Sequence, residues 1–183
     1  KLLSDDAAVS AFLTDICTGA WNEQFDAGRP FADGIAELTA RHPEQAELIE
    51  AYWLRWHEML GGEIAGTAEL LGRLKAGGVP VHAISNWSAE PFPRAREIFP
   101  FLDAFEVLVA SGMEKLVKPH APIFERFLKR AGVRAEQCLF IDDNVANIAT
   151  AAALGFHTEH FRSAEVLEAR LISLGLLASE AEA

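Results

Sequence analysis

Three places in the sequence set polar or charged side chains beside the end of a short apolar run. They are Ser85-Asn86 after residues 81–84, Lys118-Pro119, and Asp142-Asp143-Asn144 after residues 139–141. In open α/β sheets, reactive groups lie beyond the carboxyl ends of the strands. If the apolar runs are strands of such a sheet, these three places are where chemistry is expected.

Asp142 and Asp143 are adjacent carboxylates that follow a predicted strand. Two neighbouring negative charges repel each other, and a hard cation such as Mg²⁺, which prefers oxygen ligands, would remove that repulsion. The other interpretation is helix capping, in which Asp143 or Asn144 caps a helix that starts near Val145. Taken alone, the two carboxylates favour neither interpretation.

Ser85, Asn86 and Lys118 are candidates for binding an anion. The Ser85 hydroxyl and the Asn86 backbone amide could contact an anion at the start of the following helix, and Lys118 could neutralise a phosphate as a point charge. Each also has a plain structural interpretation. Ser-Asn-Trp-Ser is typical of an ordinary turn, and a lysine before a proline is usually exposed.

Beyond residue 62, short apolar runs alternate with helical patterns. Predicted strands cover Val79–Ile84, Phe105–Ala110 and Cys138–Ile141. They are apolar on both faces, which is typical of parallel strands covered by helices on both sides. Predicted helices cover Thr67–Ala76, a segment between Pro122 and Gly132, Val145–Leu154 and Ser163–Leu174. The alternation predicts an α/β fold with a parallel sheet.

Residues before Gly61-Gly62 show helical spacing throughout. Ser4 is the predicted N-cap of a first helix, and Asp5-Asp6 fits its first turn. Two more helices are expected over Phe31–Ala40 and Pro43–Leu60.

Composition excludes several classes of function. The net charge is −11, and no cluster of Lys and Arg interleaves with aromatic residues, so a nucleic-acid partner is not expected. No apolar run approaches the roughly 18 residues needed to cross a bilayer, which predicts a cytoplasmic protein without a membrane partner. Cys17 and Cys138 lie in apolar surroundings, which favours reduced thiols over a disulfide.

Taken together, the three places resemble motifs II, III and IV of the haloacid dehalogenase superfamily in their order and separation. Ala83-Ile84-Ser85-Asn86 resembles the motif with a hydroxyl after a hydrophobic strand, and Val117-Lys118-Pro119 resembles the lysine motif. A third segment resembles the acidic metal motif: Phe140-Ile141-Asp142-Asp143-Asn144, followed by Asn147 and an Ala-rich helix.

The resemblance implies a fold and an activity. The fold is α/β, with a doubly wound parallel sheet in a Rossmann-like core over residues 63–183 and an inserted all-helical cap over residues 1–62. The activity is that of a Mg²⁺-dependent phosphatase, which acts on a small phosphorylated metabolite through an aspartyl-phosphate intermediate. The oligomeric state is left open.

The resemblance also assigns roles to individual residues. Asp143 would bind Mg²⁺ directly and Asp142 through water, while Ser85, the Asn86 amide and Lys118 would hold the phosphoryl oxygens, and Asn147 would orient the metal loop or Lys118. On the cap, Trp21, Asn22 and Arg29 would contact the substrate, and Asp26, Trp53 and Trp56 are further candidates for the lid surface. For the aromatic residues, the favoured alternative is the core of the cap.

The family's first motif, an apolar strand ending in Asp-x-Asp, supplies the nucleophile and has no match ahead of the helical segment. In the resembled fold that strand lies between the strands ending at Ser85 and Asp142. Without it, buried N–H and C=O groups would lack partners, at about 1–3 kcal/mol each. We therefore expect an upstream segment of about 20 residues. The alternatives to an upstream segment are a genuine truncation and a noncatalytic relative that acts as a binding or regulatory module.

A 2-haloacid dehalogenase is the main competing enzyme. It shares the fold, the serine and the lysine, but it attacks carbon and needs no Mg²⁺. Resembling dehalogenases carry a serine and an asparagine around the acidic loop, whereas this sequence has Asp142-Asp143. The two carboxylates favour the phosphatase, although Asn144 and Asn147 weaken the distinction.

Overall fold

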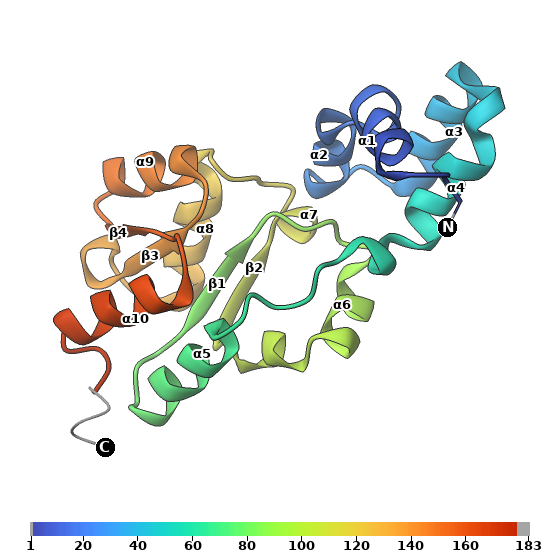
Figure 1. Ribbon diagram of the computed structural model, residues 1–183. Helices are drawn as coiled ribbons and strands as arrows, with labels where there is room; N and C mark the ends of the chain where they lie inside the picture. Colours follow the sequence, from blue (N-terminus) through green and yellow to red (C-terminus); the bar gives the residue numbers. More distant parts are fainter. Residues whose placement is uncertain (1, 179–183) are drawn as a thin grey trace.

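The computed structural model describes residues 2–178, which form a helical body and an α/β body (Figure 1). The helical body is built from α1 (Asp6–Asp15), α2 (Gly19–Asp26), α3 (Phe31–Arg41) and α4 (Ala46–Leu54), with short 3-10 turns at Pro43–Gln45 and Trp56–Met59.

Aromatic packing forms the interior of the helical body. The Phe31 ring stacks between Phe25, at 4.0 Å between centroids, and Trp53, at 4.1 Å. Gly34 is required beneath this stack, because a Cβ there would lie 2.4 Å from the Phe25 ring. The buried residues of this core are Cys17, Trp21, Phe25, Phe31, Leu38 and Ile49.

Helix boundaries in this body differ from prediction in three ways. Asp5, not Ser4, is the N-cap of α1, because its carboxylate accepts the Ala8 amide. Helix α2 is separate from α1, since Thr18 starts a new helix by accepting the Trp21 amide. The segment expected to be one helix, Pro43–Leu60, consists of α4 with a 3-10 turn before it and another after it.

The α/β body follows the predicted alternation. Its strands are β1 (His82–Ser85), β2 (Val107–Ala110), β3 (Leu139–Asp142) and β4 (His157–His160). Its helices are α5 (Thr67–Ala76), α6 (Phe92–Ile98), α7 (Ser111–Glu114), α8 (Ala121–Ala131), α9 (Val145–Ala153) and α10 (Ala164–Ser173), with 3-10 turns at Pro100–Ala104 and Ala135–Gln137. The predicted parallel α/β fold is confirmed.

The strands form two parallel pairs. In the first, β1 pairs with β2 and Ser85 lies opposite Ala110; in the second, β3 pairs with β4 and Asp142 lies opposite His160. Within residues 2–178 no strand hydrogen bond joins one pair to the other. A cavity of about 610 Å³ lies between them, lined by residues 81–84 of the first pair and 139–141 of the second.

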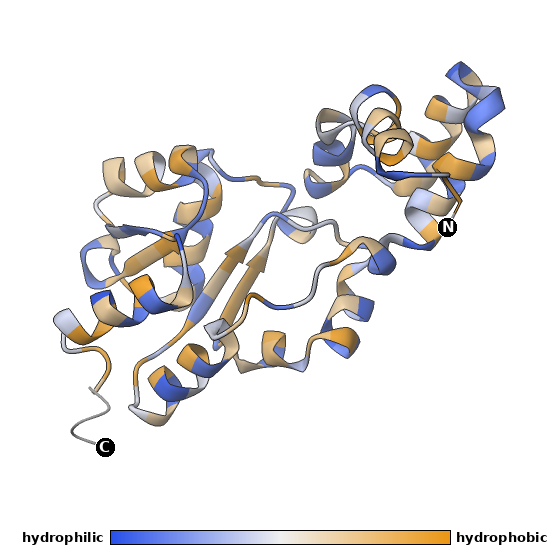
Figure 2. Cartoon of the chain, viewed as in Figure 1, coloured by the Kyte–Doolittle hydropathy of each residue, from blue (hydrophilic) through white to orange (hydrophobic). Residues whose placement is uncertain are grey.

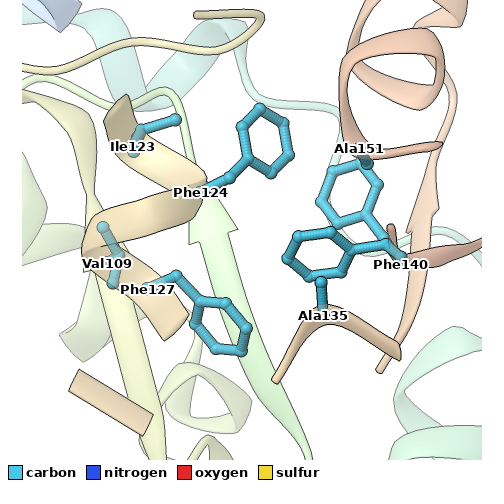
Figure 3. Close-up of a cluster of buried hydrophobic side chains, with 8 residues drawn as sticks. Val109, Ile123, Phe124, Phe127, Ala135, Phe140 and Ala151 are labelled. Atoms are coloured by element: carbon cyan, nitrogen blue, oxygen red, sulfur yellow. The ribbon is translucent and has the colours of Figure 1, made fainter. Parts of the chain in front are cut away.

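Apolar side chains from α8 pack both pairs together on one side of the cavity. Ile123, Phe124 and Phe127 belong to one buried cluster with Val109 of β2 and Phe140 of β3 (Figure 3), in which the Phe124 and Phe140 rings pack edge-on. A second cluster, centred on α5 and α10, packs against Val81 and Leu139. Strand β2, with the sequence Val-Leu-Val-Ala, is coloured hydrophobic along its length (Figure 2), as expected for a strand covered by helices, whereas β1 is hydrophilic in its first part.

Two predictions from composition can be compared with this fold. None of the helices in residues 2–178 is long and apolar enough to span a membrane. Both cysteines are thiols, as predicted, and burial raises the pKa of Cys17 to about 12.

Candidate active site

Asp142, the last residue of β3, is the centre of a polar cluster at the carboxyl end of the strands. It is 9% exposed, and Lys118 Nζ lies 2.6 Å from its Oδ2. Its Oδ1 accepts hydrogen bonds from Asn147 Nδ2 at 2.9 Å and from the Asn144 amide at 2.8 Å. Three donors therefore converge on one buried carboxylate.

These donors decide the charge state of Asp142. Burial raises the pKa of a carboxyl group, but the hydrogen bonds from Lys118, Asn147 and the Asn144 amide outweigh it and leave the pKa of Asp142 lowered. The carboxylate is thus ionised at neutral pH. It orients the Lys118 ammonium, which also lies 5.8 Å from the centre of the Phe140 ring.

Asn86 connects this cluster to the other strand pair. Its Nδ2 donates to the Lys118 carbonyl at 2.9 Å, and its Oδ1 accepts from the Lys118 amide at 2.8 Å. Since Asn86 follows β1 and Lys118 contacts the end of β3, the two bonds link the ends of both pairs. Only the backbone amide of Asn86 was considered from the sequence, so this use of its side chain was missed.

The structure therefore brings together five of the predicted site residues from places far apart in the chain. Ser85 is the last residue of β1, next to Asn86, and Lys118 joins them to Asp142 and Asn147. One expectation does not hold: α6 begins only at Phe92, so Ser85 and Asn86 do not lie at a helix start.

Asp143 differs from Asp142 in being exposed. Its backbone carbonyl lies 3.0 Å from His160 Nε2 of β4. The capping interpretation belongs to Asn144 instead, whose side chain accepts the Ala146 amide at the start of α9. Within residues 2–178 no group of three or more His, Cys, Asp or Glu is placed to hold a metal. The role of Asp142 and Asp143 as metal ligands stays a prediction.

The family model for haloacid dehalogenase-like hydrolases matches residues 8–155, most of the chain. The chain belongs to the haloacid dehalogenase-like hydrolases. This confirms the family inferred from the motifs and the fold class.

Solved structures of other family members show the same fold. A HAD-like family hydrolase of Porphyromonas gingivalis superposes with a TM-score of 0.68 over 92% of this chain and 83% of that chain, at 21% identity. A HAD family enzyme of Bacteroides thetaiotaomicron, solved with magnesium and inorganic phosphate, gives a TM-score of 0.65 over 86% and 80%, at 23% identity.

Two curated relatives are closer in sequence and have different activities. A sesquiterpene phosphatase of Aspergillus oryzae is 34% identical over 91 residues, which cover 50% of this chain and 46% of the relative. An (S)-2-haloacid dehalogenase of Pseudomonas fluorescens is 33% identical over 92 residues, covering 50% and 40%. Each match spans less than half of the relative's length.

The helical body of this HAD-like hydrolase holds the cap residues predicted to contact substrate. Trp21 is 4% exposed and packs edge-on against Phe25, so it belongs to the core of the helical body, in agreement with the alternative favoured for the aromatic residues. Asn22 accepts a hydrogen bond from the Tyr52 hydroxyl at 2.9 Å, and Arg29 donates to Glu37 at 2.5 Å. None of the contacts described for these three residues reaches the Lys118–Asp142 pair, and the substrate-binding role of Asn22 and Arg29 stays a prediction.

The segment after β1 is held on its core side by α7. The buried Ser111 hydroxyl accepts the Trp87 amide at 2.9 Å, and the Gly112 amide donates to the Trp87 carbonyl at 3.0 Å. Gly112 approaches so closely that a Cβ would lie 2.4 Å from the Ala89 nitrogen. Ser111 was not singled out from the sequence, although it directly follows the predicted strand Phe105–Ala110 and its place at a strand end could have indicated it.

Proposed function

We propose that this HAD-like hydrolase is a phosphatase that releases phosphate from a small phosphorylated metabolite. The observation that carries the proposal is the link between Asn86, Lys118 and Asp142, which sets a lysine ammonium between the ends of two parallel strand pairs. An ammonium has three N–H donors. The bond to Asp142 leaves two of them for the oxygens of a phosphoryl group.

Ser85 and Asn86 complete the proposed phosphoryl site. The Ser85 hydroxyl and the Asn86 backbone amide would donate to phosphoryl oxygens, and Lys118 would neutralise the negative charge that they share. Asn147 would act indirectly, since its bond to Asp142 fixes the carboxylate that orients Lys118. The hydrogen bonds of Asn86 and Asp142 to Lys118 support a site that needs little reorganisation when substrate binds.

The nucleophile is proposed to lie on a strand that pairs between β1 and β3. The cavity between the two strand pairs is lined almost entirely by apolar residues, and strand edges from both pairs face it. A parallel strand could pair with both edges, whereas a small apolar ligand could not satisfy their N–H and C=O groups. An upstream segment of the same protein is the proposed source of this strand.

An aspartate at the carboxyl end of that strand would lie beside Ser85 and Asp142. Its carboxylate oxygen would attack phosphorus, the alcohol of the substrate would leave, and water would then cleave the aspartyl-phosphate to release inorganic phosphate. Asp143 would hold Mg²⁺ directly and Asp142 through water. Bound Mg²⁺ neutralises charge on the phosphoryl oxygens, and the magnesium and phosphate complex of the Bacteroides thetaiotaomicron enzyme supports this choice of ion.

A 2-haloacid dehalogenase is the second candidate, favoured by the 33% identity to the Pseudomonas fluorescens enzyme. In that reaction the same nucleophile would attack carbon and displace halide. Asp142 and Asp143 argue against it, because carboxylates at this loop suit a cation that a dehalogenase does not need. The identity to the sesquiterpene phosphatase, 34%, supports the first candidate.

The test uses the protein with its upstream segment and assays phosphate release from p-nitrophenyl phosphate, with and without Mg²⁺. Release that requires Mg²⁺ and is lost in Asp143→Asn supports the phosphatase. Chloride release from 2-chloropropionate without Mg²⁺ would replace it by the dehalogenase. Neither activity would leave the noncatalytic relative as the best explanation.

A further inference from the structure

Residues 85–90, which we call the β1 loop, contact both bodies of the protein. Its first residues are held by the core, through Asn86 to Lys118 and through Trp87 to Ser111. Its later residues contact the helical cap. The loop that carries two of the proposed phosphoryl ligands is therefore also a surface on which the cap rests.

Asp26 makes the most buried of the cap contacts. It is the last residue of α2, and its Oδ1 accepts a hydrogen bond from Ser88 Oγ at 2.8 Å. Ser88 is 5% exposed, and Asp26 is half-buried. A charged acceptor makes this bond stronger than a neutral one. A cap residue thus directly holds the β1 loop two residues after Asn86.

Two other cap contacts reach the same loop. The Phe31 amide at the start of α3 donates to Glu90 Oε1 at 2.8 Å, where a carboxylate also interacts favourably with the helix dipole. The ring of Trp56 packs edge-on against Trp87 with 6.2 Å between centroids. All three contacts fall within residues 87–90, so the position of the cap and the conformation of the β1 loop depend on each other.

We propose that Asp26 is a positioning residue that, through Ser88, couples the seating of the cap to the conformation of Ser85 and Asn86. This rests on the phosphoryl-binding role proposed for those two residues. Asp26 does not touch the substrate in this scheme. It sets the chain direction at Ser88, and because consecutive Cα atoms are only about 3.8 Å apart, a shift at Ser88 reaches Asn86 within two residues.

The coupling differs from a simple tether between the bodies. A tether would change how firmly the cap is attached without changing the site, whereas the bond to Ser88 acts on the segment that binds the phosphoryl group. Asn86 precedes Trp87 in the chain and Ser88 follows it. The core therefore holds the start of the loop, and the cap holds its later part. Loss of Asp26 should leave Ser88 without its contact to the cap, while Trp87 and Glu90 keep theirs.

The experiment compares Asp26→Ala, Ser88→Ala, the double variant and Asp26→Asn in the protein with its upstream segment. Asp26→Asn keeps an oxygen acceptor for the Ser88 hydroxyl, and Glu50→Ala, an exposed carboxylate on α4, is the matched control. Hydrogen exchange of a peptide covering residues 85–91 reports on the loop without requiring activity. KM and kcat for p-nitrophenyl phosphate report on the site.

We expect loop exchange to rise in Asp26→Ala and Ser88→Ala, with KM raised about threefold to tenfold, less than the full loss of a hydrogen bond to a charged group because Asp26 acts on the site indirectly. The double variant should be no worse than either single one, because both remove the same bond. Asp26→Asn should recover most of the change, and Glu50→Ala should behave as the parent protein.

Unchanged loop exchange in Asp26→Ala overturns the proposal whatever the activity. Additive effects in the double variant also overturn it, because the two residues would then act separately. If loop exchange is faster in Asp26→Ala but the parent protein releases no phosphate, the result has a different meaning. It supports the control of the loop by Asp26 and rejects the phosphatase.

Discussion

Asp142 in the α/β body and Asp26 in the helical body are two carboxylates connected to the β1 loop, and they differ in how their charge is compensated. Asp142 accepts three hydrogen bonds, one of them from an ammonium, and its pKa is lowered. Asp26 accepts from the Ser88 hydroxyl, and burial is the largest influence on its pKa, which is raised. The core side of the site is therefore stabilised by charge pairing, and the cap side is not.

This difference indicates a division of labour between the two bodies. A buried ion pair with further hydrogen bonds defines one arrangement of its groups and is costly to break from one side. A carboxylate with a hydroxyl donor can exchange that donor for water at a smaller cost. The residues around Lys118 are thus fixed more firmly than the contact between Asp26 and Ser88.

Among the variants that test this comparison, Lys118→Ala should have the largest effect on stability and activity. It leaves the Asp142 carboxylate buried without its cation, which should lower the free energy of unfolding by about 3–5 kcal/mol. Loss of the ammonium should also reduce phosphate release by about 10²–10³-fold. Urea unfolding and the phosphatase assay measure the two effects.

Lys129→Ala, at an exposed position on α8, is the control and should change neither quantity. Adding Asp142→Asn to Lys118→Ala should restore part of the stability but none of the activity. A stability loss below about 1 kcal/mol in Lys118→Ala would show that pairing with Lys118 does not stabilise the charge of Asp142 more than the charge of Asp26 is stabilised.

Gly112→Ala should have the next largest effect and tests the core side of the β1 loop. The new Cβ would lie 2.4 Å from the Ala89 nitrogen and 2.9 Å from Ser88 Cα, so the loop must shift, at about 1–3 kcal/mol. We expect a lower melting temperature together with a higher KM.

The matched control for Gly112→Ala is Gly72→Ala in α5, where a Cβ meets no atom within 4 Å. There, the higher helix propensity of alanine should keep or slightly raise stability. Equal behaviour of the two variants would mean that the contact between α7 and the loop does not constrain the site.

Asp26→Asn should have the smallest effect and tests the cap side through its pH dependence. Because the pKa of Asp26 is raised, protonated Asp26 contributes stability below the ordinary value of 3.8, and this is lost as pH rises through the folded pKa. Asparagine carries no such penalty. The variant should therefore gain melting temperature relative to the parent as pH rises from 4 towards 7.

The gain should be less than about 2–4 °C, the shift expected for 1 kcal/mol in a protein of this size, because Asp26 is only half-buried. Thermal melts of both proteins across this pH range measure it. A constant difference between them, or a parent that is the more stable one at pH 7, would contradict uncompensated charge at Asp26.

Local signals predicted β1 to β3 and helices α5, α8, α9 and α10 of the α/β body, but β4, α6 and α7 were not predicted. Helix α8 begins beside Pro122 and ends at Gly132, whose φ of 68° lies in the left-handed region that glycine adopts easily. Helix α5 has the predicted bounds. The break between α1 and α2 was not predicted, although Gly19 follows it directly and Thr18 caps α2 through a side-chain hydrogen bond to the Trp21 amide.

The site was predictable where it depends on strand ends and was missed where it depends on contacts between elements. Ser85 and Asp142 could be named because parallel strands end at one edge of a sheet, and Lys118 because Val117-Lys118-Pro119 resembles the lysine motif of the family. The bond from Ser88 to Asp26 joins residues 62 positions apart, and no periodicity in the sequence indicates it. The burial of Trp21 likewise follows from how the cap helices pack, since its aromatic character suits both a core and a lid.

By itself, the sequence determined the family, the parallel α/β pattern and the residue types available for phosphoryl transfer, because these depend on composition, local periodicity and the order of motifs along the chain. Only the tertiary structure decided which partner each polar group has. Asn86 bonds to the backbone of Lys118, Asp142 pairs with its ammonium, and Asp26 holds Ser88. Hydrogen bonds act over about 3 Å, so they are decided by how the elements pack and not by their spacing in the chain.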